Sequence, residues 1–245
     1  MSERMTLEFD TQDQLFVQLD WADDSALVTA VQRCIEAQRA AAAGALRRYR
    51  PHPEAARHVS PEALDQILRS GVRINGIATE PEISNCIAFN FGKVQGAVLN
   101  QDVVELRRRV DQIVAAKLRA LFRNGRPLQI TNSGHFWYPP GGYMSWHTNL
   151  RTPGWRLYIN YVDEPGKSFF RYRHPDTGEI TTATDRTWNF RLFKITPQRP
   201  LWHAIYSETN RFSIGYKVTP RPSFVRRAAR RLSTWVTSSG RPGVS

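Results

Sequence analysis

Short apolar runs separated by turn residues fill the second half of the chain, and they constrain its fold more than any other feature. Between two of these runs, Pro175-Asp176-Thr177-Gly178 is a strong signal for a hairpin turn. Many short strands punctuated in this way are typical of a β-barrel or β-sandwich. The strands predicted here are 128–137, 156–162, 168–173, 180–182, 189–195 and 211–218.

The first half of the chain predicts helices that support this β region. Residues 100–122 form the clearest helix, with an apolar stripe at helical spacing and Asn124-Gly125 as a stop signal. Two further helices are expected over about 25–49 and 60–71, each preceded by a residue that can cap it. A long amphipathic helix normally buttresses a sheet, and we expect residues 100–122 to do so.

These patterns predict a single α+β unit in three parts. Residues 1–127 form a support region of helices and strands, 128–219 form the β core, and 220–245 form a basic tail. Within the tail, apolar residues recur at helical spacing over 223–236, which favours a basic amphipathic helix. We expect that helix to pack on the barrel, although binding of its arginines to a membrane or nucleic acid is the alternative.

Charge and cysteine content narrow the environment and the partners. The formal net charge of +12, from 34 basic and 22 acidic residues, favours anionic partners or is simply a solvated basic surface. Cys34 and Cys86 lie in apolar contexts without a partner motif, so neither a disulfide framework nor a zinc site is expected. With no apolar leader or bilayer-length run, we expect a reducing cytoplasmic location.

Two histidines and one arginine carry the chemistry of the β region. His147 and Asn149 are two apart, so on an extended backbone their side chains project from the same face. His203 follows 56 residues after His147 (203 − 147), and Arg211 follows eight residues after that (211 − 203). Two imidazoles, a third donor and a cationic anchor suit a mononuclear iron site with an acidic cosubstrate.

The span 136–218 resembles the double-stranded β-helix (jelly-roll, cupin-like) core of the iron(II)/2-oxoglutarate-dependent oxygenases, and most closely the prolyl 4-hydroxylase branch. That family has a His-x-Asp, a distal His and an Arg-x-Ser. Here these are His147-Thr148-Asn149, His203 and Arg211-Phe212-Ser213. A family tyrosine before the first histidine corresponds to Tyr138, and a Tyr-Leu-Asn strand end is echoed by Tyr161-Val162-Asp163.

The resemblance implies a hydroxylase that uses Fe(II), 2-oxoglutarate and O2 and releases succinate and CO2. It implies that His147, Asn149 and His203 ligate the metal, and that Arg211 binds the distal carboxylate of the cosubstrate. The catalytic set is then His147, His203 and Arg211. The cosubstrate-binding residues implied are Tyr138, Tyr161, Arg211 and Ser213.

Asn149 departs from the family pattern, because the third ligand is usually acidic. An amide oxygen can coordinate iron but adds no negative charge, so weaker metal retention should follow. Three readings stay open, in this order: an ordinary hydroxylase with an amide ligand, a non-catalytic barrel that only binds, and a halogenase in which chloride takes the third position. A sugar-binding or nucleic-acid-binding barrel is the alternative from a different class.

The prime substrate is not readable from the sequence beyond its being a small molecule or peptide, with an anionic group as one option. Candidate substrate contacts lie close to the metal residues in the chain. They are Trp146, Arg151, Trp155 and Arg156. His135, which shares a strand with Tyr138, and His174, beside the hairpin turn, are reserve histidines.

Overall fold

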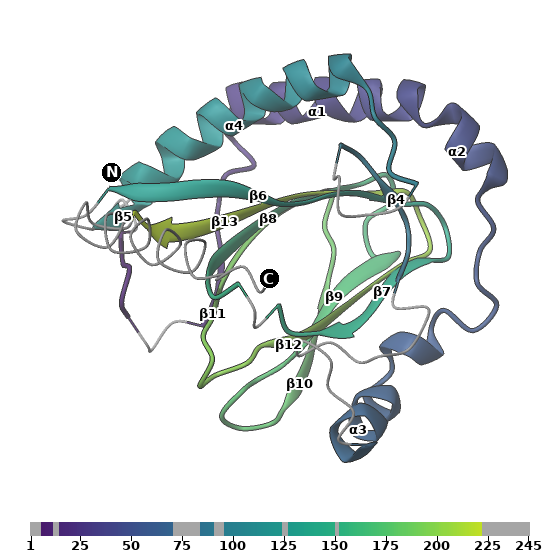
Figure 1. The fold of residues 1–245 in the computed structure, drawn as a ribbon, viewed down its shortest axis with the longest axis vertical. Coiled ribbons are helices and arrows are strands. Elements are labelled where there is room, and N and C mark those ends of the chain that lie inside the picture. The colour runs from purple at the N-terminus through teal and green to yellow at the C-terminus, as the bar shows by residue number, and fades with distance from the viewer. Residues whose placement is uncertain are drawn as a thin grey trace, which may run out of the picture.

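Eight antiparallel strands between residues 128 and 220 form the centre of the structure. The structure is a computed structural model, and it describes residues 6–11, 15–70, 84–90, 96–123, 127–149 and 152–221. Successive strands alternate between two sheets, except that β9 and β10 form a hairpin within one of them (Figure 1). The strands are β6 (Leu128–Tyr138), β7 (Gly142–His147), β8 (Gly154–Val162), β9 (Ser168–Arg173), β10 (Ile180–Thr184), β11 (Trp188–Ile195), β12 (Trp202–Ser207) and β13 (Arg211–Pro220).

The strand order makes this core a double-stranded β-helix. The larger sheet has the order β2-β11-β8-β13-β6-β4, and the smaller sheet has the order β10-β9-β12-β7-β3. The eight strands β6–β13, four in each sheet, therefore follow the double Greek-key path of a jelly roll. The fold is α+β, as the sequence predicts, and the hairpin over residues 175–178 is confirmed by the pairing of β9 with β10.

Short strands from the first half of the chain extend both sheets. They are β2 (Phe16–Gln18) beside β11, β3 (Ser84–Asn85) beside β7 and β4 (Ile87–Ala88) beside β6. A separate parallel pair joins β1 (Leu7–Glu8) to β5 (Phe122–Arg123). The first half thus completes the edges of the barrel.

Two long helices cover the outer face of the larger sheet (Figure 1). α1 (Ser25–Ala41) is capped by Asp24 and α4 (Gln101–Leu121) by Asn100, because each side chain accepts a hydrogen bond from a backbone N–H three residues on. The predicted helix over 100–122 is confirmed. The one predicted over 25–49 divides at Ala42 into α1 and α2 (Ala43–Arg48).

A smaller helical layer covers the outer face of the smaller sheet. It consists of η1 (Arg57–Val59) and α3 (Pro61–Ser70), which begins after Ser60 as predicted. Tyr143 and Trp202 of the sheet pack against Leu64 and its neighbours there. Both sheets are therefore covered on the outside, and the predicted helix over 223–236 lies outside the described residues.

Side-chain alternation gives each sheet an inner and an outer set. On β13, Phe212 and Ile214 pack outward in the same core cluster as residues of α1 and α4. Tyr158 of β8 and Phe193 of β11 belong instead to a cluster between the two sheets, and its other buried members are Tyr138, Phe170, Ile195, Leu201 and Ile205. This inner cluster of rings surrounds the site described below.

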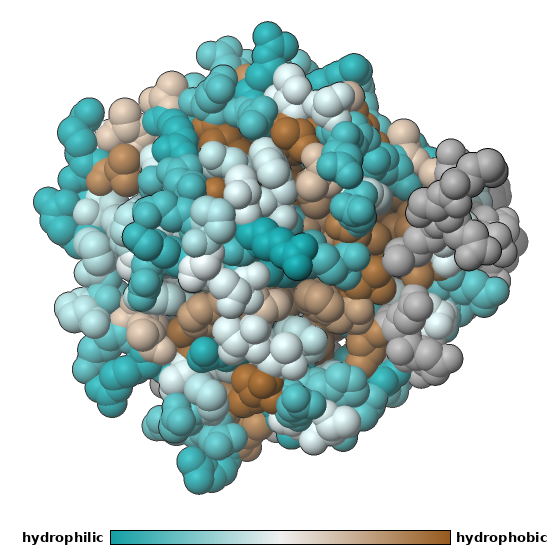
Figure 2. Space-filling model, turned by 180° about the vertical axis from the view of Figure 1, so that it is seen from behind, coloured by the Kyte–Doolittle hydropathy of each residue, from teal (hydrophilic) through white to brown (hydrophobic). Residues whose placement is uncertain are grey.

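The face of the protein drawn in Figure 2 is largely polar. On the face turned away from the viewer in Figure 1, hydrophilic residues dominate and hydrophobic ones form smaller patches (Figure 2). Among the described residues, the exposed large hydrophobic side chains are Leu46 and Leu99. None of the described helices is long and apolar enough to span a membrane.

Candidate active site

His147 and His203 form a cross-strand pair on the smaller sheet. His147 ends β7, His203 lies on β12, and the two are direct partners in the antiparallel register. Their ring centroids are 4.0 Å apart, and both side chains are buried. Residues 56 positions apart in the chain thus meet, as the metal-site prediction requires.

The hydrogen bonds of the two rings leave one nitrogen of each imidazole available. His147 Nδ1 lies 2.8 Å from the carbonyl oxygen of Ser145, and His203 Nδ1 lies 2.9 Å from that of Leu201. A carbonyl can only accept, so each Nδ1 carries the proton and each Nε2 keeps its lone pair. This is the tautomer in which histidine binds a metal through Nε2.

Burial keeps both imidazoles neutral at pH 7. It lowers the pKa of His147 to about 4 and, together with the neighbouring His147, lowers the pKa of His203 well below its ordinary value. The charged form would lose its hydration inside the barrel. Two neutral imidazoles side by side are suitable ligands for a divalent ion.

Asn149 places its amide beside the same nitrogen of His203. Its backbone φ is +55°, in the left-handed region that asparagine tolerates better than most residues. The amide nitrogen lies 3.3 Å from His203 Nε2. Because metal–nitrogen bonds are about 2.1 Å, two ligands at right angles on one metal lie about 3 Å apart.

The residues therefore fit a divalent metal held by two imidazoles and an amide. A half-turn about the end of the Asn149 side chain exchanges its nitrogen and oxygen. With the oxygen toward His203, the amide would offer a metal a third donor atom. In the described part of the chain, no group of three or more His, Cys, Asp or Glu side chains is arranged to hold a metal.

Arg211 lies between the two sheets at the start of β13. Its guanidinium is fully buried and lies over the ring of Tyr138, with 5.4 Å between Cζ and the ring centroid. Its Nε donates to Asp185 Oδ2 at 2.8 Å. Nη1 and Nη2 have no hydrogen-bond acceptor among the described residues.

Ser213 shares the inner face of β13 with Arg211, as the two-residue spacing predicts. Its hydroxyl accepts a hydrogen bond of 2.9 Å from Asn160 Nδ2 of β8. Asn160 Oδ1 is buried and has no donor among the described residues. The inner face thus presents an arginine fork, a hydroxyl and a carbonyl oxygen close together on neighbouring strands.

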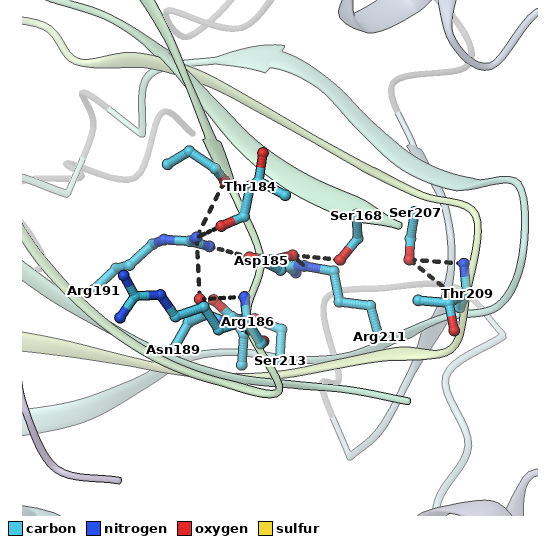
Figure 3. Close-up of polar contacts among 12 residues, drawn as sticks. Ser168, Thr184, Asp185, Arg186, Asn189, Arg191, Ser207, Thr209, Arg211 and Ser213 are labelled. Atoms are coloured by element: carbon cyan, nitrogen blue, oxygen red, sulfur yellow. Dashed lines mark hydrogen bonds and ion pairs between the residues drawn. The ribbon is translucent and has the colours of Figure 1, made fainter. Parts of the chain in front are cut away.

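Asp185, which no sequence motif marks, ties this group together (Figure 3). It lies between β10 and β11, and its carboxylate contacts Arg191, Arg211 and the hydroxyl of Ser168. Burial alone would raise the pKa of Asp185, but the two guanidiniums and Ser168 outweigh it and hold that pKa below its usual value. A buried anion is therefore kept in place by two buried cations.

One layer of aromatic rings separates the arginine cluster from the histidine pair. The ring of Phe170 lies 5.4 Å from that of His203, and the Arg191 Cζ lies 5.6 Å from the Phe170 centroid. Tyr158 is also near His203, with ring centroids 6.3 Å apart. The histidine pair and the arginine cluster thus both contact the aromatic ring of Phe170 between the two sheets.

Arg156 is the predicted substrate residue that the structure brings to this interior. It is buried on the inner face of β8, where Nη2 donates to the backbone oxygen and hydroxyl of Thr152. Nη1 has no acceptor among the described residues. Its positive charge contributes to the lowered pKa of His203, so the two lie within electrostatic reach.

The structure does not bring Tyr161, Trp155 and Trp146 to the interior. Tyr161 and Trp155 pack in the outer cluster beneath α1 and α4, and the indole of Trp155 donates to the backbone oxygen of Phe9. Trp146 packs outward against η1 and α3, and its indole donates to the backbone oxygen of Ser60. Strand alternation is the cause, because neighbours of inward-facing residues face out.

The remaining candidates lie elsewhere. His135 is buried on the helix side of β6, in contact with Cys34 and Gln38 of α1. His174 lies at the β9–β10 hairpin, where its Nδ1 accepts from the backbone of Asp176 and Thr177. Arg151 is outside the described residues. Neither reserve histidine joins His147 and His203.

Comparisons with known proteins give structural neighbours only. No family model matches the chain, and no curated protein matches it. Among solved structures, a prolyl hydroxylase in complex with a hypoxia inducible factor oxygen degradation domain peptide fragment, from Trichoplax adhaerens, is 12% identical with a TM-score of 0.44 and covers 84% of this chain and 83% of its own.

Two further neighbours are of the same kind. A Pseudomonas putida prolyl-4-hydroxylase is 12% identical with a TM-score of 0.42, covering 85% of this chain and 94% of its own. A viral collagen prolyl hydroxylase from Paramecium Bursaria Chlorella virus-1, solved as a 2OG complex, is 9% identical with a TM-score of 0.38, covering 84% and 96%. At such identities and scores, we take the chemistry of the site from its own residues.

Proposed function

We propose that this protein is an Fe(II)/2-oxoglutarate-dependent oxygenase that hydroxylates a C–H bond and releases succinate and CO2. The observation that carries the proposal is the fully buried Arg211, whose Nη1 and Nη2 lack an acceptor in the described chain. Unsatisfied buried donors on a charged group cost several kcal/mol, so such a fork calls for an anion. Arg191 of the same arginine cluster contacts the ring of Phe170, and that ring also contacts His203 of the neutral histidine pair.

In this proposal His147, His203 and Asn149 hold the metal. The two imidazoles offer Nε2 lone pairs because their Nδ1 protons are bound to backbone carbonyls. The Asn149 amide, whose nitrogen lies 3.3 Å from His203 Nε2, would offer its oxygen at the same place after a half-turn of the side-chain end. When bound, iron(II) supplies the redox chemistry that couples O2 and oxidative decarboxylation of the 2-oxo acid to oxidation of the substrate.

The other inner residues bind and orient the cosubstrate. Arg211 presents two parallel N–H donors that match a carboxylate, a geometry that lysine does not supply. The hydroxyl of Ser213 lies on the same face, and Tyr138 lies under the guanidinium. The surrounding rings exclude water, which strengthens each of these polar contacts.

Arg156 gives the prime substrate its proposed charge preference. Its Nη1 is buried without an acceptor among the described residues, and its positive charge contributes to the lowered pKa of His203. A negatively charged group on a small molecule or peptide would satisfy it. We therefore propose an anionic substrate and expect the formal net charge of +12 to favour its approach.

The second candidate function is a barrel that binds an anion without catalysis. It is favoured by the position of the Asn149 amide nitrogen, which can donate to His203 Nε2 and so occupy the lone pair that a metal needs. The amide also adds no negative charge to retain the metal. A halogenase ranks third, because the amide takes the space that a chloride would need.

An anaerobic titration tests the proposal. Fe(II) and 2-oxoglutarate together should give the weak visible charge-transfer band of the chelate, and His203→Ala should abolish it. His174→Ala is the matched control, because this histidine lies on the hairpin, and its band should persist. If no band appears at saturating concentrations, the oxygenase proposal is wrong and the binding barrel is favoured. Chloride should leave the band unchanged; a shift would favour the halogenase.

A further inference from the structure

The contacts of Asp185 are divided between two arginines in an unequal way. Its Oδ1 accepts from Arg191 Nη1, and its Oδ2 accepts from Arg211 Nε at 2.8 Å and from Ser168 Oγ at 2.5 Å. Arg211 therefore donates to this carboxylate through its Nε alone. Figure 3 shows Asp185 between the two guanidinium groups.

This division is not the arrangement that an isolated pair would adopt. An arginine and a carboxylate normally pair through two parallel N–H···O bonds, because the guanidinium fork matches the two oxygens. Such a pair between Asp185 and Arg211 would engage one of the Nη atoms as well. In the structure Arg191 donates to Oδ1 instead, and Arg191 is itself held by the backbone oxygens of Ala183 and Thr184.

The net charge of the Arg191–Asp185–Arg211 cluster also favours the binding of an anion. Arg191 and Arg211 bring two positive charges and Asp185 one negative charge, so the buried cluster keeps a net charge of +1. A single carboxylate would neutralise it. Without Arg191, Asp185 and Arg211 would form a neutral pair, and this cluster would have no net charge to offer a ligand.

We propose that Arg191 is a positioning residue that keeps the Arg211 fork open for the distal carboxylate of the cosubstrate. It acts by holding Asp185 Oδ1 and by leaving the cluster one positive charge. This inference rests on the proposed function, since it assigns a role within the same cosubstrate site. It adds Arg191 and Asp185 to the residues that set selectivity for a dicarboxylic over a monocarboxylic 2-oxo acid.

Two acids that differ only at their distal end separate this role from a structural one. Calorimetry in the presence of Mn(II), a redox-inert stand-in for iron, would give dissociation constants for 2-oxoglutarate and 2-oxopentanoate. Arg191→Met should weaken 2-oxoglutarate binding about tenfold or more, the effect of losing one charge and one open fork. Binding of 2-oxopentanoate, which has no distal carboxylate, should change less than about threefold.

Asp185→Asn should act in the opposite direction. An amide cannot form the charged bidentate pair, so the fork stays open and the cluster carries a net charge of +2. The preference for 2-oxoglutarate over 2-oxopentanoate should therefore be kept or increased, even though the protein is less stable. If one of these two variants does not fold, the other still decides the question.

Arg107→Met is the matched control. Arg107 is also buried and ion-paired, to Asp111, but it lies on α4 outside the barrel interior. Its replacement should lower stability and leave both dissociation constants unchanged. Equal weakening of both acids by Arg191→Met would overturn the positioning role while leaving the oxygenase proposal intact. If wild-type protein binds neither acid, both proposals fail.

Discussion

Replacing Asn149 with Asp exchanges the amide nitrogen for a carboxylate oxygen at the proposed metal site. The substitution tests whether this side chain is a metal ligand. The Asn149 amide lies 3.3 Å from His203 Nε2, at the separation expected for two ligands of one ion. Asp has nearly the same size and shape as Asn but carries a negative charge. We therefore expect Asn149→Asp to bind a divalent metal more tightly.

The size of the effect follows from the charge and its distance. Two opposite unit charges 4 Å apart attract by about 4 kcal/mol at an effective dielectric constant of about 20. Removing the carboxylate from water offsets part of this gain. A net gain of about 1.4 to 3 kcal/mol remains, which corresponds to roughly 10-fold to 100-fold tighter binding.

Calorimetric titration with Mn(II), with and without 2-oxoglutarate, would measure this change. Asn149→Leu serves as the control, because it keeps the bulk of the side chain and removes its ligand atom; its metal affinity should fall below that of the wild type. An unchanged affinity in Asn149→Asp would place residue 149 off the metal and refute the ligand assignment.

Three further predictions concern residues around the site. Trp155→Ala should lower the free energy of unfolding by about 3–5 kcal/mol, measured by urea denaturation, because it empties a buried position beneath the helices; Mn(II) affinity of the folded protein should not change. Tyr161→Phe should leave the dissociation constant for 2-oxoglutarate unaltered, since Tyr161 faces outward; a clear loss would contradict that placement. The pKa of Asp185 is lowered in the folded state, so its contribution to stability is present above the unfolded pKa of about 3.9 and is lost as pH falls through the folded value. As the pH falls below about 5, the free energy of unfolding should therefore decrease less in Asp185→Asn than in the wild type. If the free energy of unfolding depends on pH in the same way in both proteins, the buried ion pair is contradicted.

Much of the fold could be predicted from the sequence because its signals are local. The α4 helix follows from an apolar stripe at helical spacing and a capping asparagine, Asn100. The β9–β10 hairpin follows from the turn residues 175–178. The helix predicted over 25–49 instead ends at Ala41 and a second helix follows. The prediction missed this break because the segment around Ala42 is rich in alanine and gives no local signal for an interruption.

The candidate site could be predicted in part. Two-residue spacing put Arg211 and Ser213 on one face, and the resemblance of the chain to a known pattern singled out His147 and His203. Strand alternation could not say which face of β8 was inner. Both faces of that strand are buried and carry aromatic residues, so hydrophobicity does not distinguish Tyr161, which packs outward, from Tyr158, which packs inward.

The sequence by itself determined the β texture, the helices that cover it and the identity of two histidines and one arginine with suitable chemistry. Only the tertiary structure decided that Asp185 holds Arg211 through Nε alone while Arg191 takes its other oxygen. That arrangement joins a loop to two strands that lie in the same sheet but are separated by β8. Long-range pairing of this kind depends on which strands become neighbours, and no local pattern in the chain encodes it.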